Sequence, residues 1–184
     1  AWTAEERGLL GSEYYADHPW LPLETTVANF TMDVLQPNGL ARDVVLVGAG
    51  QNELESLLTQ KAAGQGRVVT PDAKPERGLA FRADHFPFAR RGVPALLLMG
   101  MGGGHDLVNG GREAGDRWVA DFTGKCYHQA CDRWSESWDL RGAAQDVTLI
   151  YQMASQLANS RAWPQWNPGN EFKAVRDSTV AQRK

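Results

Sequence analysis

The sequence lacks an excess of basic residues. It contains 19 Lys and Arg residues against 22 Asp and Glu residues, which gives a formal net charge of −3 at pH 7. Proteins that follow a phosphate backbone carry a basic patch or stripe, because Lys and Arg neutralise the phosphates. The composition therefore argues against nucleic acid as a partner.

Long apolar runs and abundant cysteines are also missing. The longest apolar run, residues 93–101, is interrupted by Pro94 and Gly100, whereas a helix that spans a bilayer needs about 20 apolar residues. The sequence thus predicts no membrane span. Cys126 and Cys131 are the only two cysteines, which are too few for a disulfide scaffold, and the sequence leaves open whether they pair.

Several familiar catalytic motifs are absent. The chain contains neither G-x-S-x-G nor H-E-x-x-H, which argues against the common serine hydrolases and zincins. Gly48 and Gly50 follow an apolar run, but Glu53 stands where a dinucleotide motif has its third glycine, so a strand-to-helix turn is expected there. The glycines at 100–104 lack the Lys-Ser/Thr pair of a phosphate loop, and we expect His105 beside them to be exposed.

What the sequence does contain is an alternation of apolar strands and amphipathic helices. With 184 residues, of which 42% are hydrophobic, the chain is long enough for one domain with a sizeable core. The patterns predict strands at 25–35, 43–50, 67–70 and 93–100, helices at 3–16, 52–63 and 142–160, a helical turn at 83–92, and loop at 100–115. This alternation predicts an α/β three-layer sandwich with a mixed, mostly parallel sheet. We expect the Trp-rich tail at 162–169 to cover the edge of the domain.

Asp33 is the first candidate functional residue, because it follows the apolar segment TVANFTM. In open α/β sheets, sites lie beyond the carboxyl ends of the strands. A buried charge costs several kcal/mol, of the order of 3–5, unless it is paired or binds a metal. Backbone amides or an arginine could equally satisfy this carboxylate.

His128 lies in the segment KCYHQACDRW, between the two cysteines. Cys126, His128 and Cys131 are all possible zinc ligands, but no second pair of Cys or His lies at a usable spacing, which argues against a zinc knuckle. The alternative interpretation is an ordinary surface histidine.

Glu5 and Glu6 are adjacent carboxylates close to the start of the sequence, in WTAEERGLL. Thr3 and Glu6 have the spacing of a capping box, in which Glu6 would reach back to the N–H of Thr3 at the start of a helix. Both acids would also favour the positive end of the helix dipole. Local pattern alone therefore explains the pair without any catalysis.

Four separated motifs together resemble the two-zinc aminopeptidases of peptidase family M28. They are TAEERGLLGSEYYA, NFTMDVL, FRADHFPFARRGVPALLL and KCYHQACD, in this order and spacing, and the resemblance continues into the tail through EFKAVRD. It implies a metal-dependent aminopeptidase with a zinc-exopeptidase-like fold, whose substrate is a peptide with a free N-terminus.

The resemblance also implies a role for each matching residue. Glu5 corresponds to the general base that takes a proton from the zinc-activated water. Glu6 and His128 correspond to ligands of one zinc and Asp33 to a ligand of the other, whereas Asp84 and His85 lie near the site without binding metal. Ala83 and Phe81 depart from the expected Ser and Tyr, which weakens polar support near the substrate carbonyl.

The family supplies a further His and a metal-bridging Asp from strands that come before the Glu-Glu segment. Nothing precedes Ala1 in this sequence, so we expect residues 1–184 to be the C-terminal portion of one catalytic domain, incomplete at its N-terminal side. A missing N-terminal segment or another chain would then complete the site, and the fragment alone would have little activity. We expect a periplasmic or secreted location, and a specificity pocket shaped by loops such as residues 100–120.

Two other functions fit the same resemblance. A glutaminyl-cyclase-like acyltransferase would use one zinc ion in the same fold. A metal-free binding module would use the fold without catalysis, and the presence of Glu6, Asp33 and His128 argues against it.

Overall fold

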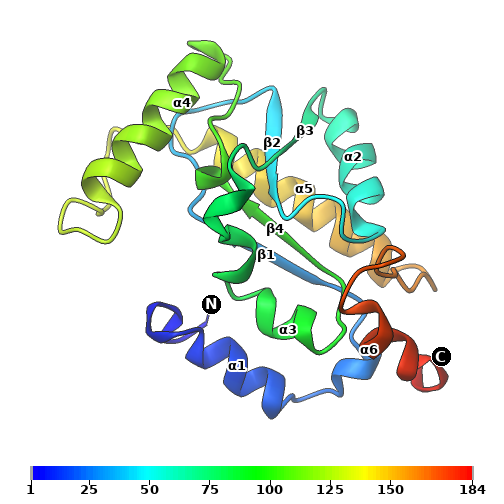
Figure 1. The fold of residues 1–184 in the computed structure, drawn as a ribbon. Coiled ribbons are helices and arrows are strands. Elements are labelled where there is room, and N and C mark those ends of the chain that lie inside the picture. The colour runs from blue at the N-terminus through cyan, green and yellow to red at the C-terminus, as the bar shows by residue number, and fades with distance from the viewer. Residues whose placement is uncertain (1, 184) are drawn as a thin grey trace.

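The computed structural model describes residues 2–183, and its centre is one sheet with the strand order β1-β4-β2-β3 (Figure 1). β1 is parallel to β4 and β3 is parallel to β2, whereas β2 is antiparallel to β4. The mixed, mostly parallel sheet that the sequence predicts is confirmed. The strands are β1 Asn29–Asp33, β2 Asp43–Val47, β3 Val68–Pro71 and β4 Ala95–Met99.

Helices surround this sheet, and none in the described part of the chain is long and apolar enough to cross a membrane. The α-helices are α1 Leu10–Asp17, α2 Leu54–Gly64, α3 Phe86–Arg90, α4 Gly111–Asp121, α5 Arg141–Ala158 and α6 Lys173–Ser178. Short 3-10 turns occupy η1 Glu5–Arg7, η2 Leu23–Thr25, η3 Pro75–Arg77, η4 Leu79–Phe81, η5 Gly100–Gly102 and η7 Val180–Gln182, and a π-helical turn, η6, occupies Phe122–Cys126.

The two central strands bury both of their faces. All residues of β2 and β4 are buried, and because successive side chains on a strand point to opposite faces, each strand contributes to two cores. One core joins Leu46 and Leu98 to α2 and α5, whose contributing residues are Leu54, Leu58, Leu149, Ile150, Met153 and Leu157. The other joins Val47 and Leu97 to Leu79, Ala83 and Met101.

The Trp-rich tail closes one end of the molecule, as the sequence predicts. Trp166 is buried, and its indole N–H donates to the carbonyl oxygen of Gly92 at 2.9 Å. The same residue pairs with Asn52 in an isolated bridge. In Figure 1 this segment and α6 lie beside α2 and α3.

Beyond the N-terminal segment, the predicted bounds of one strand and one loop are wrong. The strand expected at 25–35 is restricted to Asn29–Asp33, because η2 occupies its first residue and the chain turns after Asp33. The loop expected at 100–115 ends early, since α4 begins at Gly111. The glycines of this stretch disfavour a helix in a prediction from sequence. In the structure, Glu113 and Arg117, which lie one helical turn apart, form an ion pair of 2.5 Å that stabilises α4.

A buried group of charges lies at the amino end of β2. The side chain of Asp43 is fully buried and accepts hydrogen bonds from Thr70 and from the N–H of Asp106, both at 2.8 Å. Arg112 lies 2.7 Å and His105 3.4 Å from its carboxylate. Burial alone would raise the pKa of Asp43, but these hydrogen bonds outweigh it and hold the pKa well below its usual range.

The expected exposure of His105 is therefore wrong. This histidine is 3% exposed, because it packs against a carboxylate that lies more than 60 residues away in the sequence. Arg67 and Asp146 form a second buried ion pair at 2.6 Å, and the guanidinium of Arg67 also donates a hydrogen bond to the backbone carbonyl of Asp43.

We predict that Asp43→Asn lowers the free energy of unfolding by about 2–3 kcal/mol, since it leaves buried donors without a charged acceptor. The control is Asp177→Asn, which removes an exposed pair on α6 and should cost less than about 0.5 kcal/mol. Urea titrations at pH 7 measure both changes.

The pH dependence of this stabilisation follows from the direction in which folding shifts the pKa of Asp43. Because the pKa of Asp43 is lower in the folded protein, its contribution is present above about pH 4 and is lost as the pH falls further. The difference between the wild-type protein and Asp43→Asn should shrink below that pH. Equal urea midpoints at pH 7 would show that the carboxylate does not stabilise the fold.

Candidate functional site

Asp33 ends β1 at the carboxyl end of the sheet, beside Met99 of the parallel strand β4. The next residue, Val34, has a left-handed φ of 43° and turns the chain away from the sheet. Its carbonyl oxygen accepts a hydrogen bond of 2.9 Å from the N–H of Gly100. A Cβ at residue 100 would lie 2.7 Å from that oxygen, so glycine permits the close approach that sets the position of Asp33.

Glu5 and Glu6 lie on the tight 3-10 turn η1. Residues with positive φ flank the turn, namely Ala4 at 55°, Gly8 at 97° and Leu9 at 60°. Consecutive residues on such a turn point about 120° apart. The two carboxylates therefore face different surroundings: Glu5 is half-buried and Glu6 is exposed.

The continuous helix from residue 3 and its capping box are wrong. α1 begins at Leu10, and neither η1 nor α1 has a side-chain cap hydrogen bond. Gly8 and Leu9 have left-handed backbone angles that an α-helix cannot include. Thr3 uses its carbonyl oxygen instead, which accepts a hydrogen bond of 2.9 Å from the N–H of Gly11.

His128 lies on the loop after α4 and faces Glu6. Its Nε2 atom is 2.9 Å from Oε1 of Glu6, with 44% and 65% of the two side chains exposed. The imidazole stacks on the ring of Tyr127 at a centroid distance of 3.8 Å, and Tyr127 packs in turn against Phe122. The structure thus brings together two sequence-predicted residues that are more than 120 positions apart.

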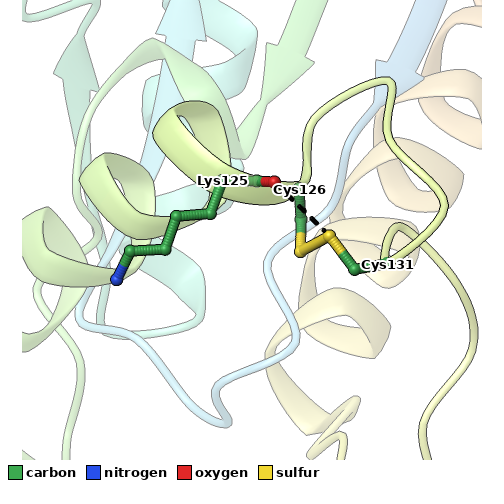
Figure 2. The surroundings of a disulfide bond; sticks show 3 residues. All are labelled: Lys125, Cys126 and Cys131. Carbon is green, nitrogen blue, oxygen red and sulfur yellow. Dashed lines mark hydrogen bonds between the residues drawn. A yellow bond between two sulfur atoms is a disulfide. The ribbon is translucent and has the colours of Figure 1, made fainter.

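Cys126 and Cys131 form a disulfide bond that encloses His128 in the sequence (Figure 2). This resolves the pairing that the sequence leaves open. It also removes the zinc-knuckle alternative, because zinc binds cysteine as a thiolate and both sulfurs are already bonded to each other.

Negative charge is concentrated around this histidine. Burial and the neighbouring carboxylates of Glu6, Asp33 and Asp84 raise the pKa of Glu5. Burial, Asp84 and Glu6 likewise raise the pKa of Asp33, and His128 opposes both shifts. Within residues 2–183, no Lys or Arg forms an ion pair with any of these carboxylates, and His128 is the basic partner of Glu6.

Asp84 belongs to this carboxylate cluster, whereas His85 does not share its surroundings. The hydroxyl of Ser12, which is fully buried, donates to Asp84 at 2.5 Å. His85 is 7% exposed and lines a separate cavity of ≈90 Å³ with Phe86 and Trp166. Burial lowers the pKa of His85 to about 4, so this imidazole is neutral at pH 7.

Oε1 of Glu6 and Nε2 of His128 lie 2.9 Å apart. Carboxylate oxygen and imidazole nitrogen are both common zinc ligands. In the part of the chain that the structure describes, no three His, Cys, Asp or Glu side chains lie close enough together to hold a metal ion by themselves. Asp33 therefore lies near the pair and contributes to its field without joining it as a third ligand.

A groove of ≈1090 Å³ adjoins the cluster and is mainly apolar. Sequence reasoning expects the specificity pocket from residues 100–120, but of that stretch only Trp118 lines this groove. The signal that could have found the groove is the i, i+4 spacing of the aromatic residues Trp118 and Phe122, which stack on each other in the structure. The lining of the groove includes Val34, Leu35, Trp118, Phe122, Trp134 and Trp138, together with both cysteines of the disulfide.

Comparison with known proteins adds one positive finding. The model of a family described as peptidase family M28 matches residues 1–152, which include η1, β1 and the disulfide loop. The match does not extend over the tail. A search of curated proteins finds no match.

We predict that Gly100→Ala lowers the free energy of unfolding by about 1–3 kcal/mol, since its Cβ would press against the carbonyl oxygen of Val34. The matched control is Gly64→Ala at the end of α2, where a Cβ meets nothing within 4 Å and helix propensity improves by up to about 1 kcal/mol. Urea titration of both variants measures the difference. Equal stability of the two variants would contradict the close approach.

Proposed function

Since the chain belongs to peptidase family M28, whose members are metal-dependent peptidases, we propose that it is a zinc aminopeptidase that removes the N-terminal residue of a peptide. The observation that carries the proposal is the Glu6–His128 pair, whose donor atoms lie 2.9 Å apart beside the half-buried carboxylates of Glu5 and Asp33.

The residues present fit zinc by their chemistry and by their charge. Carboxylate oxygen and imidazole nitrogen are zinc ligands. Burial together with neighbouring carboxylates raises the pKa of Glu5 and of Asp33, and no Lys or Arg among residues 2–183 forms an ion pair with either of them. A divalent cation would relieve this repulsion. We assign Glu6 and His128 to one zinc ion and Asp33 to a second.

When bound, the zinc ions supply Lewis-acid polarisation of the scissile carbonyl and make water nucleophilic near neutral pH. The protein's own groups do the rest. Glu5 accepts the proton of the attacking water and passes it to the leaving amine, a role for which its raised pKa suits it. Asp84, held by Ser12, adds negative charge that attracts the ammonium group of a free peptide N-terminus.

The aromatic groove accommodates the side chain of the substrate. It lies between the end of β1 and the disulfide loop, so a peptide whose N-terminal amine is near Asp33 has its first side chain beside Val34 and Trp118. Apolar groups gain free energy when they leave water for such a surface, at about 25 cal/mol per Å². We therefore propose apolar and aromatic N-terminal residues as the preferred substrates.

The intramolecular disulfide supports a periplasmic or secreted location, because disulfides persist in oxidising compartments. The further His and Asp ligands that the sequence analysis expects, from another segment or another chain, stay a prediction.

In the full-length enzyme, replacing Glu5 with glutamine should lower kcat for an apolar aminoacyl-nitroanilide by about 10²–10⁴-fold, because the amide cannot accept a proton. KM and zinc content should change little. The control is Glu76→Gln on the exposed turn η3, which should leave kcat unchanged. A wild-type rate for Glu5→Gln would refute the general-base assignment.

The zinc content of the dialysed full-length protein, measured by elemental analysis, should be two ions per chain. Glu6→Ala and His128→Ala should each remove one ion, and combining them should remove no further zinc, whereas Asp33→Asn should remove the other ion. A single zinc ion in the wild-type protein would favour the glutaminyl-cyclase-like function, and its complete absence would favour a metal-free binding module.

A further inference from the structure

The disulfide closes a small ring that contains His128. Cys126 and Cys131 are five positions apart, with a Cα–Cα distance of 5.2 Å, and the histidine lies between them. Cys131 Sγ also lies 3.4 Å from the carbonyl oxygen of Lys125, at the end of the π-helical turn (Figure 2). The bond therefore ties the far side of the loop back to the end of the helix from which the loop starts.

Few other contacts fix this loop. In the described chain from 128 to 138, the backbone hydrogen bonds are local, such as Gln129 N–H to Cys126 and Asp132 N–H to Gln129, both near 2.9 Å. The ion pair with Glu6 is the link from this segment to a distant part of the sequence. The segment borders the aromatic groove, and among residues 126–131 Tyr127 packs against a core cluster.

His128 has a backbone conformation that an unconstrained loop would abandon. Its φ of 61° is in the left-handed region, which residues other than glycine rarely adopt. Within the closed ring this conformation directs the imidazole to the ring of Tyr127 and to Glu6. An opened ring would allow the residue to return to negative φ, which moves the imidazole away from Glu6.

We propose that the Cys126–Cys131 disulfide is a positioning element for His128: when closed it holds the imidazole against Glu6, and when a dithiol reduces it the metal site is weakened. The inference rests on the proposed zinc site. It identifies Cys126 and Cys131 as residues that act through His128 and do not themselves bind metal or substrate.

The chemistry of opening is a two-electron exchange. A dithiol attacks one sulfur, the S–S bond breaks, each cysteine sulfur takes up a proton, and the dithiol leaves as its own cyclic disulfide. Cys131 is exposed and Cys126 is half-buried, so a small dithiol can reach the bond. Residues 1–184 contain no other cysteine, so within this part of the protein the reductant acts on this bond alone.

The first experiment measures zinc affinity by competition with a chromophoric chelator. The full-length protein is compared with the Cys126→Ser/Cys131→Ser variant and with wild-type protein that has been reduced, alkylated and freed of reductant. Both opened forms should bind the zinc ion at Glu6 and His128 about 10–100-fold more weakly, while the ion at Asp33 is unaffected. Circular dichroism checks that both forms are folded.

A double-mutant cycle separates positioning from general destabilisation. In a His128→Ala background, where the site keeps only a weak residual affinity that is measured at excess zinc, loss of the disulfide should cause no further loss of that affinity, because the group that it positions is gone. An equal additional loss in that background would overturn the inference. Equal zinc affinity of the closed and opened forms would overturn it as well.

Hydrogen exchange of the metal-free protein provides a readout that does not depend on the proposed function. Opening the ring should accelerate amide exchange in residues 127–133 and leave β4 unchanged. If the wild-type protein binds no zinc, the proposed function fails, and the exchange rates still decide whether the bond holds the loop. Unchanged exchange in residues 127–133 would refute the positioning role.

Discussion

Strands β2 and β4 bury apolar side chains on both faces, and the rest of the chain is arranged around this requirement. α2 and α5 cover one face, and the segment from Leu79 to Ala83 covers the other together with Met101. Polar groups have no place within such a sheet, since an unpaired buried charge costs several kcal/mol, of the order of 3–5. They gather at the ends of the strands, where Asp33 meets Glu5 and Glu6 from η1.

The arrangement explains which features could be predicted from the sequence. The central strands and α5 follow from local apolar patterns, and Asp33 follows from its place after an apolar run. The burial of His105 depends on Asp43, and the η1 turn depends on backbone angles at Gly8 and Leu9. No local pattern contains that information. The Glu6–His128 contact was accessible only through the order of separated motifs, because no spacing rule connects residues so far apart.

The disulfide loop combines two properties that usually exclude each other. It borders a wide groove and is partly exposed, which is typical of segments with low local stability. It also carries the imidazole of the proposed zinc site, whose position relative to Glu6 would have to be fixed within a fraction of an ångström. In that proposal the covalent ring restricts the exposed backbone that follows Tyr127, which itself packs against the core.

Asp43 on the one hand, and Asp33 and Glu5 on the other, differ in the groups that surround their carboxylates. Asp43 is fully buried, yet the facing imidazole of His105, together with hydrogen bonds from Thr70 and a backbone amide, keeps its pKa low. The pKa values of Asp33 and Glu5 are raised, because burial is reinforced by neighbouring carboxylates and is not offset by comparable donors. A carboxylate that serves the fold is surrounded by donors, as Asp43 is. Carboxylates that repel one another destabilise the fold, and their concentration around one histidine is the arrangement expected where a cation and an ammonium group are to be bound.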